Sequence, residues 1–546
     1  MSPGQWILPA LAQAPVGCGS GGVVMQFDVL VVGCGPVGAL AANLLGRAGL
    51  NTLVVEQELE PHPLPRAVHL DHEAMRLLQS AGVAGTVSSD MREAEGHLHV
   101  GADHGVIRYM GTAGRPKPYG WANDYFFYQP EFEEHLRQAL TAYPNVELRL
   151  GVAFESLAQD ADGVTVVLGD GTRARSRWVI ACDGARSAVR KQLGVALDDL
   201  DFDEPWLVVD AEVEGPVRFP DLADVPAGAN LQRLSVMMCD PRRPATVVPG
   251  RGNHRRWEFM LLPGEEEEAM MRPDKVAELL SPYLEGVPHR LVRAATYRFH
   301  GLVAERWQVG RVFLAGDAAH QTPPFFGQGM CHGFRDVANL AWKLQLVERG
   351  GAPASLMTTY QAERDPHVRQ VISAAIDAGR YICLLDPAAA AARDAQMRAQ
   401  AREATPRTAA DLIPPIHAGL VAAGAPGAGQ RFVQPKLDAG RGERLLDELG
   451  QGWRLVVARE AMAAAAGAAA AERLPRLPLQ VIAADAVPDG GALADWLEAR
   501  SAAAVLVRPD HYLFGGAADA EALEPLLDQL ARGLYGEAAR PLETVA

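Results

Sequence analysis

The chain has 546 residues, which exceeds one ordinary domain and predicts two or three. Acidic residues outnumber basic ones by 67 to 51, giving a formal charge of −16, and such a surface repels polyanions, so nucleic acid and anionic membranes are poor candidate partners. The composition, 48% hydrophobic and 22% charged, is typical of a soluble globular protein.

The N-terminal 24 residues contain a short apolar run, but no Lys or Arg precedes Arg47, so a signal peptide is not expected. We interpret residues 1–24 as a disordered extension before Met25, and whether they belong to the natural protein stays open. No run of about 18 apolar residues is available to cross a membrane. The six cysteines are scattered, without a C-x-x-C pair or metal-ligand spacing, which predicts no metal site and fits a reducing cytoplasm.

A β-α-β pattern opens the ordered chain: a strand over Phe27–Val32, a helix over Val37–Ala48 and a strand over Thr52–Val55. The turn between the first two has glycines at Gly33, Gly35 and Gly38, with Pro36 among them. Glycines in this order permit a tight turn, close approach of a diphosphate and close helix packing, and the helix N-terminus favours an anion. Glu56 ends the second strand and can bind a ribose. The unit predicts a dinucleotide site, but it does not distinguish FAD from NAD.

A second motif follows the expected strand Trp178–Ala181. It contains Asp183, Gly184 and Arg186. It could contact a flavin and an incoming pyridine nucleotide, with Arg186 pairing with a phosphate. A capped turn, with Asp183 as N-cap of a helix over Ser187–Leu193, explains it equally well.

Residues 201–299 read differently, with alternating strands at Leu207–Val213, Leu234–Met238 and Trp257–Leu262 that predict an antiparallel sheet over a pocket. We expect apolar side chains of this sheet to form a dry cover for the reaction, namely Met237, Met238, Trp257 and Phe259.

A third motif follows the expected strand Arg311–Ala315. Gly316-Asp317 places a carboxylate where the ribityl chain of a flavin could be held. Pro324, Gly327, Gly329 and Met330 then lead into a helix over Met330–Val347, whose N-terminus would face the anionic edge of a reduced flavin. A nicotinamide dehydrogenase needs no such second element, so FAD is the expected cofactor. His320 is expected to pack near it.

The chain therefore divides into an extension, an interrupted domain, an insert, a linker and a C-terminal domain. The expected fold is α/β, with a Rossmann-like FAD-binding domain, an antiparallel-sheet substrate domain and a C-terminal α/β domain. The expected boundaries are 1–24 for the extension, 25–200 and 300–385 for the FAD-binding domain, 201–299 for the substrate domain, 386–430 for the linker and 431–546 for the C-terminal domain.

The order of the three motifs resembles that of the class A FAD-dependent aromatic monooxygenases, the phenol-type hydroxylases, over nearly the whole chain from Met25. Further phrases are similar to the subgroup of 3-(3-hydroxyphenyl)propionate hydroxylases, among them Pro65-Arg66-Ala67-Val68, Asp71-His72-Glu73-Ala74, Arg256-Trp257-Glu258-Phe259-Met260 and Arg335-Asp336-Val337-Ala338-Asn339. The resemblance implies that Arg66 and Gln129 contact the flavin, Asp317 its ribityl chain, and Gly329–Met330 the isoalloxazine ring. The C-terminal segment resembles a thioredoxin-like domain, but no cysteine follows Cys383, so a contact role is expected rather than a redox role.

The resemblance further implies an enzyme that consumes NADH or NADPH and O2 and hydroxylates a small phenolic substrate ortho to its hydroxyl, with 3-(3-hydroxyphenyl)propionate as the expected substrate and a cytoplasmic location. A homo-oligomer is allowed. The candidates for favouring a phenolate are His69 and Asp71, which come just after the expected flavin contact Arg66. Phenol hydroxylases carry an acidic residue near this position, whereas this chain has Val68, so their catalytic base is not carried over directly. Arg233, Arg255 or Arg256 could bind a propionate.

Three alternatives stay open at this stage. A flavoprotein of the same fold could do other chemistry, although the Trp-x-Trp sequence expected of a halogenase is absent. A flavin-free nicotinamide dehydrogenase and a catalytically idle FAD-binding module are the other two.

Overall fold

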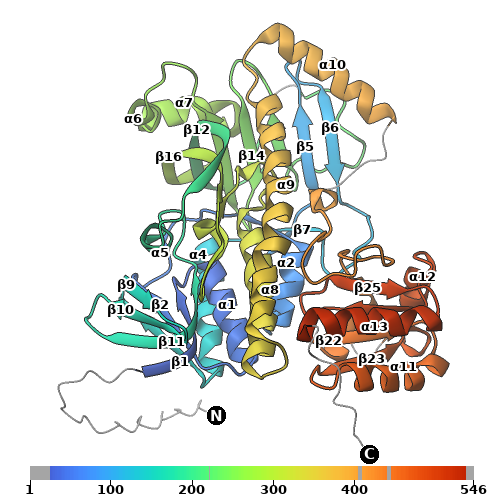
Figure 1. Cartoon of the computed structure of the whole chain (residues 1–546). Coiled ribbons are helices and arrows are strands. Elements are labelled where there is room, and N and C mark those ends of the chain that lie inside the picture. The colour runs from blue at the N-terminus through green and yellow to red at the C-terminus, as the bar shows by residue number, and fades with distance from the viewer. Residues whose placement is uncertain (1–24, 220–221, 404–408, 439–443, 537–546) are drawn as a thin grey trace, which may run out of the picture.

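The computed structural model describes residues 25–219, 222–403, 409–438 and 444–536, so the expected N-terminal extension lies outside the described residues. Figure 1 shows two sheet domains stacked one above the other and joined by long helices, with a third domain beside the lower one. The fold is the expected mixture of α and β structure.

The lower domain is built on a parallel sheet whose strands β1, β2 and β18 are largely apolar and buried, as strands covered on both faces are. Its central order is β18-β11-β1-β2-β8, all parallel, and the meander β9-β10 extends from β11. Helices α1, α4 and α8 pack together beside it. The bounds are β1 Met25–Val32, α1 Pro36–Arg47, β2 Thr52–Glu56, α4 Gln129–Ala139, β8 Val146–Leu150, β9 Phe154–Gln159, β10 Val164–Leu168, β11 Arg173–Ala181, α5 Ala188–Gln192, β17 Gln308–Val309, β18 Val312–Leu314 and α8 Gly329–Glu348.

The upper domain is an eight-stranded sheet that is antiparallel except where β13 runs parallel to β5. Two long strands, β12 and β16, connect it with the lower domain (Figure 1). The order and bounds are β19 His320–Gln321, β16 His289–Ala304, β12 Leu197–Val213, β15 His254–Met260, β14 Ala245–Pro249, β13 Ser235–Met238, β5 Gly96–Val100 and β6 Val106–Gly111; α6 (Glu267–Met270) and α7 (Pro273–Leu284) belong to the same domain.

The structure differs from the expected boundaries in two places. Residues 96–111 form β5 and β6, so the upper sheet takes strands from a segment expected in the lower domain. The expected linker 386–430 begins with helix α10, Pro387–Glu403, which packs along β6 (Figure 1). Its Ala- and Pro-rich composition suggested a linker, but alanine is the strongest helix former, and Arg393 anchors the helix by donating to the carbonyls of Tyr381 and Cys239.

The two faces of the upper sheet pack against different cores, because neighbouring residues on a strand point to opposite faces. Trp257, Phe259 and Met238 belong to the core on the α7 side, whereas Met237 belongs to the main core of the lower domain. The expectation that all four cover the reaction site is therefore wrong for three of them.

Two further long helices and a small sheet complete the body. Helix α9 (Thr359–Ile382) runs from the lower to the upper domain (Figure 1). The small sheet joins β3 (His69–Asp71), β7 (Asp124–Phe126) and β4 (Arg92–Glu93), and helices α2 (His72–Ser80) and α3 (Ala84–Ser88) follow β3.

The C-terminal domain is a four-stranded sheet with three helices. The strand order is β23-β22-β24-β25, with β22 and β23 parallel and the other pairs antiparallel. The bounds are β20 Lys436–Leu437, β21 Arg444–Leu445, β22 Trp453–Val457, α11 Glu460–Arg473, β23 Leu479–Ala483, α12 Ala492–Glu498, β24 Ala504–Val507, β25 Leu513–Ala517 and α13 Ala520–Tyr535. The alanine-rich stretch is helix α11. The thioredoxin-like assignment stays a prediction.

Buried charges join this domain to the lower one. Arg76 of α2 donates to both carboxylate oxygens of Asp447, at 2.6 and 2.9 Å, and Arg454 of β22 shares that carboxylate. In a second cluster, Glu363 of α9 accepts from Arg508 at 2.6 Å. All five side chains are buried. Because an unpaired buried charge is costly, these pairs fix how the domains dock.

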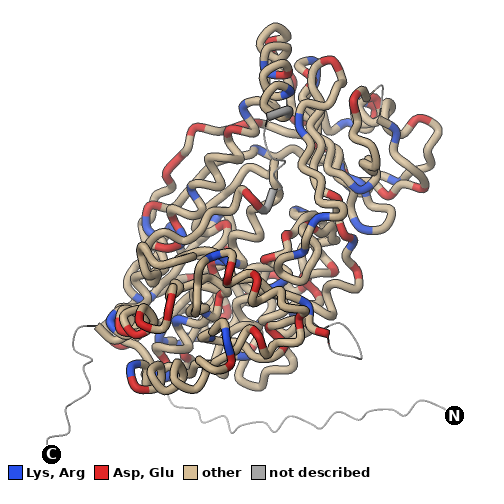
Figure 2. Tube along the Cα trace, turned by 90° about the vertical axis from the view of Figure 1, so that its right-hand side faces the viewer, with Lys and Arg blue, Asp and Glu red and all other residues tan. Residues whose placement is uncertain are grey.

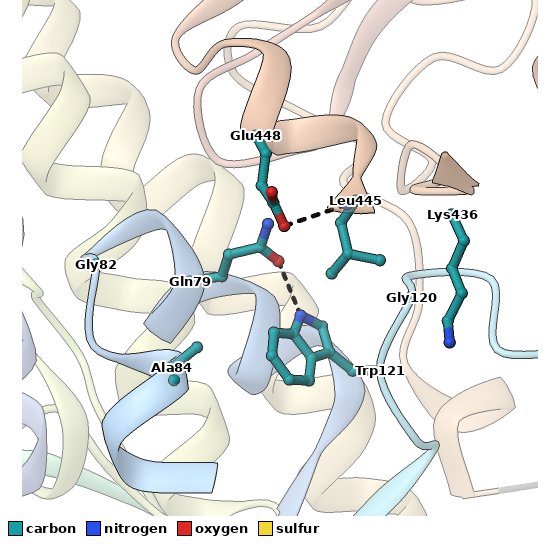
Figure 3. A pocket seen from close by; sticks show the side chains of 9 residues that line it. Gln79, Gly82, Ala84, Gly120, Trp121, Lys436, Leu445 and Glu448 are labelled. Carbon is teal, nitrogen blue, oxygen red and sulfur yellow. Dashed lines mark hydrogen bonds between the residues drawn. The ribbon is translucent and has the colours of Figure 1, made fainter. Parts of the chain in front are cut away.

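A hollow of about 330 Å³ lies at the same junction (Figure 3). Trp121 donates to Gln79 across one wall at 2.8 Å, while Leu445 and Glu448 of the C-terminal domain face them (Figure 3). None of the residues expected to bind a cofactor lines it.

The structure shows how the charged residues, the apolar helices and the cysteines are distributed. Acidic and basic residues are interspersed along the coloured trace in Figure 2. Among the described helices, none combines the length and apolar character that crossing a bilayer requires. The five cysteines within the described residues are free thiols.

The Asp447 cluster predicts a large, site-specific loss of stability. Asp447→Asn leaves Arg76 and Arg454 buried without their counter-charge, so the free energy of unfolding in urea should fall by about 3–5 kcal/mol. Asp528→Asn, which removes an exposed partner of Arg473, is the control and should cost less than about 1 kcal/mol. Equal losses in both variants would contradict the assignment.

Candidate active site

The glycine turn after β1 has the shape that close approach of a ligand requires. Gly33 has a φ of +94°, and a Cβ added at Gly38 would lie 1.9 Å from the Gly33 carbonyl oxygen. A Cβ at Gly35 would meet no protein atom within 4 Å. Gly33 and Gly38 are therefore fixed by packing, whereas the space beside Gly35 is open. Pro36 begins α1, whose first turn has no side-chain cap to occupy its N–H groups.

Glu56 closes the other side of this turn. Its carboxylate accepts from the Cys34 N–H at 2.6 Å and from the Glu58 N–H at 3.0 Å. The predicted ribose-binding acid therefore lies against the glycine turn, at the end of β2.

The Asp183 segment ties two loops together. Ser187, rather than Asp183, is the N-cap of α5, and Asp183 accepts from Val189 at 3.1 Å. Arg190 donates to the carbonyl of Ala318 at 3.0 Å and so links this segment to the loop after β18. Gly184 has a φ of +76° and open space beside it, and Arg186 is exposed.

Asp317 follows β18, in the loop that leads to β19. Its side chain is exposed, yet desolvation by the surrounding protein raises the pKa of its carboxyl. A hydrogen bond from the Gly316 N–H to Asp336 of α8, at 3.1 Å, holds the loop. Asp336 also accepts from His320 at 2.7 Å and from Arg364 at 2.9 Å, so His320 supports the loop rather than facing a substrate.

The third loop turns from Pro324 into α8. Gly327 adopts a φ of +63°, and a Cβ there would lie 2.5 Å from Nδ1 of His69. Beside Gly329 the space is open. Met330 is partly buried, and the first turn of α8 has no side-chain cap, so its N–H groups are available to an anion.

Gln129 and Arg66 form one unit. The Gln129 side-chain oxygen accepts from the backbone N–H groups of Arg66 and Ala67 at 2.9 and 2.6 Å, and its amide donates to Glu133. Gln129 thus holds the backbone that presents the exposed Arg66 side chain.

His69 forms a buried ion pair with Asp124, Nε2 to Oδ1 at 2.9 Å. Burial disfavours the charged ring, but the hydrogen bond and charge of Asp124 raise the pKa of His69 overall. His97 lies beside it, with a ring-centroid separation of 5.8 Å, and burial lowers the pKa of His97 to about 4. Ligand atoms of these three residues lie within 4.8 Å of one another, close enough for a metal ion, although the His69–Asp124 pair is complete without one.

Asp71 is placed differently from His69. Its carboxylate accepts from Arg335 at 2.6 Å and caps α2 through the Ala74 N–H at 2.9 Å, and Arg335 holds the pKa of Asp71 low despite burial. Arg335 also donates to Glu73 and to Gln328, the residue between the two loop glycines. Asp71 therefore fixes the loop around the site.

The three arginines proposed for a propionate are engaged elsewhere. Arg233 pairs with Glu95. Arg255 donates to backbone carbonyls and lies on the opposite face of β15 from Arg256. Arg256 uses its guanidinium on Asp210 and on the carbonyls of Pro65 and Arg66.

Sequence reasoning missed the polar face of the upper sheet. Register places one buried row across it, on the side of His97 and the lower domain's core, consisting of His99, Met237, Thr246, Glu258 and Val208. Period-two alternation along β15 places Glu258 and Trp257 on opposite faces of the sheet. Strand pairing, which the sequence alone does not give, is needed to tell which face lies toward the lower domain.

The loops fit a dinucleotide with a flavin head. The space beside Gly35 is open, the Glu56 carboxylate lies against the glycine turn, and the Asp317 side chain is exposed with a raised pKa. The N-terminus of α8, which has no side-chain cap, follows Asp317 in the chain. In a bound FAD, Glu56 would hold the adenosine ribose, the turn at Gly35 the diphosphate, Asp317 the ribityl chain and the N-terminus of α8 the flavin ring.

Two family models match the chain. One, described as an FAD binding domain, matches residues 26–375, and the other, described as the HcaD C-terminal domain, matches residues 429–533.

Curated relatives cover almost the whole chain. A probable NADH-specific resorcinol 4-hydroxylase of Rhodococcus jostii (strain RHA1) is 36% identical over 98% of this chain and 99% of its own length. A 3-(3-hydroxy-phenyl)propionate/3-hydroxycinnamic acid hydroxylase of Burkholderia vietnamiensis (strain G4 / LMG 22486) is 34% identical over 89% of this chain and 93% of its own length.

Solved structures agree in fold. The flavin-dependent monooxygenase PieE, in complex with FAD and substrate, superposes with a TM-score of 0.78 at 24% identity, covering 93% of this chain and 99% of that one. Aklavinone-11 hydroxylase, in a ternary complex with FAD and aklavinone, has a TM-score of 0.72 at 26% identity with the same coverage.

The open space at Gly35 gives a direct test of the cofactor's position. Gly35→Ala adds a methyl group where the protein offers room but a bound diphosphate would not, so FAD binding should weaken at least about tenfold while thermal stability without FAD stays unchanged. Flavin fluorescence titration measures FAD affinity in the wild type, in Gly35→Ala and in a control, Gly85→Ala, whose Cβ also meets nothing within 4 Å. Unchanged FAD affinity in Gly35→Ala would contradict the placement.

Proposed function

Because the chain belongs to the family of FAD-dependent aromatic hydroxylases, we propose that it uses NADH to hydroxylate a meta-substituted phenol ortho to its hydroxyl. The electron balance is that NADH supplies two electrons, one atom of O2 enters the ring and the other leaves as water. Bound FAD supplies the oxygen-activating chemistry. The observation that carries the proposal is the buried polar face of the upper sheet. This face lies on the side of the lower domain, where its Arg256 bonds to the Arg66 loop.

Support for a meta-substituted phenol comes from the two relatives, one named for resorcinol and the other for 3-(3-hydroxy-phenyl)propionate. The second substrate carries a carboxylate and needs a cation. Arg108 of β6 is the better candidate for it. It is the register partner of His99 on the buried polar face, and among the described residues its guanidinium contacts Tyr381 at 3.5 Å but no carboxylate.

We assign His69 the role of a fixed positive charge. Its raised pKa keeps the ring protonated to higher pH than usual, with Nε2 held by Asp124 and Nδ1 3.5 Å from the Gly327 carbonyl. An imidazolium so placed stabilises a phenolate or a reduced, anionic flavin electrostatically. Asp71 would then act through Arg335, by positioning the strand and the loop.

The wider setting of the proposal follows the same reasoning. The free, scattered cysteines support a reducing cytoplasm as the location. NADH is the favoured reductant because the resorcinol relative is named as NADH-specific.

The first experiment follows NADH oxidation by the FAD-loaded enzyme with and without resorcinol, 3-(3-hydroxyphenyl)propionate and phenol. We expect oxidation to rise on adding a meta-substituted phenol, the product to gain one oxygen atom by mass spectrometry, and NMR to place the new hydroxyl ortho to the original one. NADH oxidation that no phenol stimulates, with peroxide as the sole product, would overturn the proposal.

Arg108→Gln separates the two substrates. Losing a charge-assisted contact to a carboxylate should raise KM for 3-(3-hydroxyphenyl)propionate at least about tenfold and leave KM for resorcinol unchanged. A parallel rise for both substrates would assign Arg108 a structural role instead.

His69→Gln removes the fixed charge and should lower the yield of product per NADH. Asp124→Asn keeps the ring but lowers its pKa, so the yield of that variant should recover as pH falls and His69 regains its proton. His135→Gln, which changes a surface histidine, serves as the control. Wild-type yields in His69→Gln at every pH would remove His69 from the mechanism.

A further inference from the structure

Glu258 of β15 is a buried carboxyl that pairs with no other described side chain. Its residue is 9% exposed, and among the described residues its oxygens have neither a hydrogen bond nor an ion pair. Buried carboxyls elsewhere in the chain, such as Asp210 and Asp447, are paired with arginines. A desolvated, unpaired carboxyl is destabilising, and such residues are typical of functional sites.

The neighbours on β15 locate this carboxyl. Two residues before it, on the same face, Arg256 donates to the backbone of Pro65 and Arg66. Two residues after it, Met260 is the register partner of Trp206, whose ring lies 5.9 Å from that of Phe325. Glu258 therefore lies between Arg256, which holds the Arg66 loop, and the Met260–Trp206 pair, whose Trp206 ring packs on the Pro324–Phe326 turn. Both loops are expected at the flavin ring.

Thr246 adds a second polar group at the same place. It is the register partner of Glu258 on β14, it is buried, and among the described residues its hydroxyl has no hydrogen-bond partner either. Cross-strand partners on one face lie about 5 Å apart. A buried hydroxyl and a buried carboxyl side by side, both unpaired, match a ligand that supplies a hydroxyl.

His69 leaves a base unassigned. The hydrogen bond and charge of Asp124 raise the pKa of His69 and so favour the protonated ring, which cannot take a proton from a phenol. His97, whose pKa is lowered to about 4, is neutral. However, it lies in the same cross-strand row as Arg256, which bonds to the Arg66 loop, and not in the row of Glu258.

We infer that Glu258 is the general base that ionises the phenolic substrate, and that Thr246 hydrogen-bonds to the same hydroxyl. The inference rests on the proposed hydroxylation. In the step, the phenolic O–H bond breaks, the proton bonds to a carboxylate oxygen of Glu258, and the electron pair stays on the phenolate oxygen. The carboxylic acid later releases this proton to water.

The charges around Glu258 suit that task. Burial raises the pKa of its carboxyl to about 7, while Arg256 and Arg293 oppose the rise and Asp210 adds to it. A base with a pKa near the working pH is partly ionised at rest and still strong enough to accept a proton.

The test compares Glu258→Gln with wild type on two substrates, resorcinol and 2,3,4,5-tetrafluorophenol, which keeps one ortho carbon free and is far more acidic. With resorcinol, kcat should fall about 100-fold, within the usual range for losing a general base. With the fluorinated phenol, already largely ionised in water, the two enzymes should differ by less than about threefold. Comparing variants on one substrate cancels the slower chemistry of the electron-poor ring.

Four further measurements separate a catalytic role from a structural one. FAD content should match wild type, and the melting temperature of Glu258→Gln should be equal or higher, since the change removes an unpaired buried carboxyl. Thr246→Val should raise KM more than it lowers kcat. Glu278→Gln, on α7 behind the sheet, should leave both constants unchanged.

An equal loss on both substrates, or none on either, would overturn the role of Glu258. No hydroxylation of any phenol by wild type would instead overturn the proposed function.

Discussion

Buried charge on helix α8 is the constraint on which the rest of the structure depends. This helix lies in the middle of the molecule, and its polar side chains have to find partners there, because an unpaired buried charge is costly. Arg335 pairs with Asp71 and Glu73, and Asp336 accepts from Gly316, His320 and Arg364. Asn339, one turn further on, and Lys343, one turn beyond that, contact Glu363, which also binds Arg508 of the C-terminal domain. The pairs fix the two cofactor loops and dock the third domain.

The two faces of the upper sheet have different compositions and different roles. The face under α7 is apolar and holds the sheet together, whereas the face toward the lower domain has charges and hydroxyls within reach of the flavin loops. Asp210 forms ion pairs with Arg256 and Arg293 on that face, whereas Arg108 and Glu258, which share one row, have no ion pair among the described residues. The proposed substrate would lie along this row, with its hydroxyl at Glu258 and any carboxylate at Arg108.

Local patterns in the sequence predict the β-α-β unit, the long helix and the strands of the C-terminal domain, because apolar periodicity and glycine turns are written within short windows. They do not predict which strands pair. Register alone turns Trp257 away from the flavin side and Glu258 toward it, and it brings β5 into the upper sheet. Likewise the engagement of Arg256 by Asp210, and the pairing of His69 with Asp124, join residues 46 and 55 positions apart. The loop residues that face the cofactor were identifiable because each motif is contiguous.

One measurement tests the central claim most directly. The FAD-loaded enzyme is supplied with NADH and a meta-substituted phenol under 18O2 in ordinary water, and the 18O content of the product is measured by mass spectrometry. The account predicts one 18O atom per product molecule, ortho to the original hydroxyl. A product whose new oxygen comes from water, or NADH oxidation that yields only labelled peroxide with each phenol tested, would contradict it.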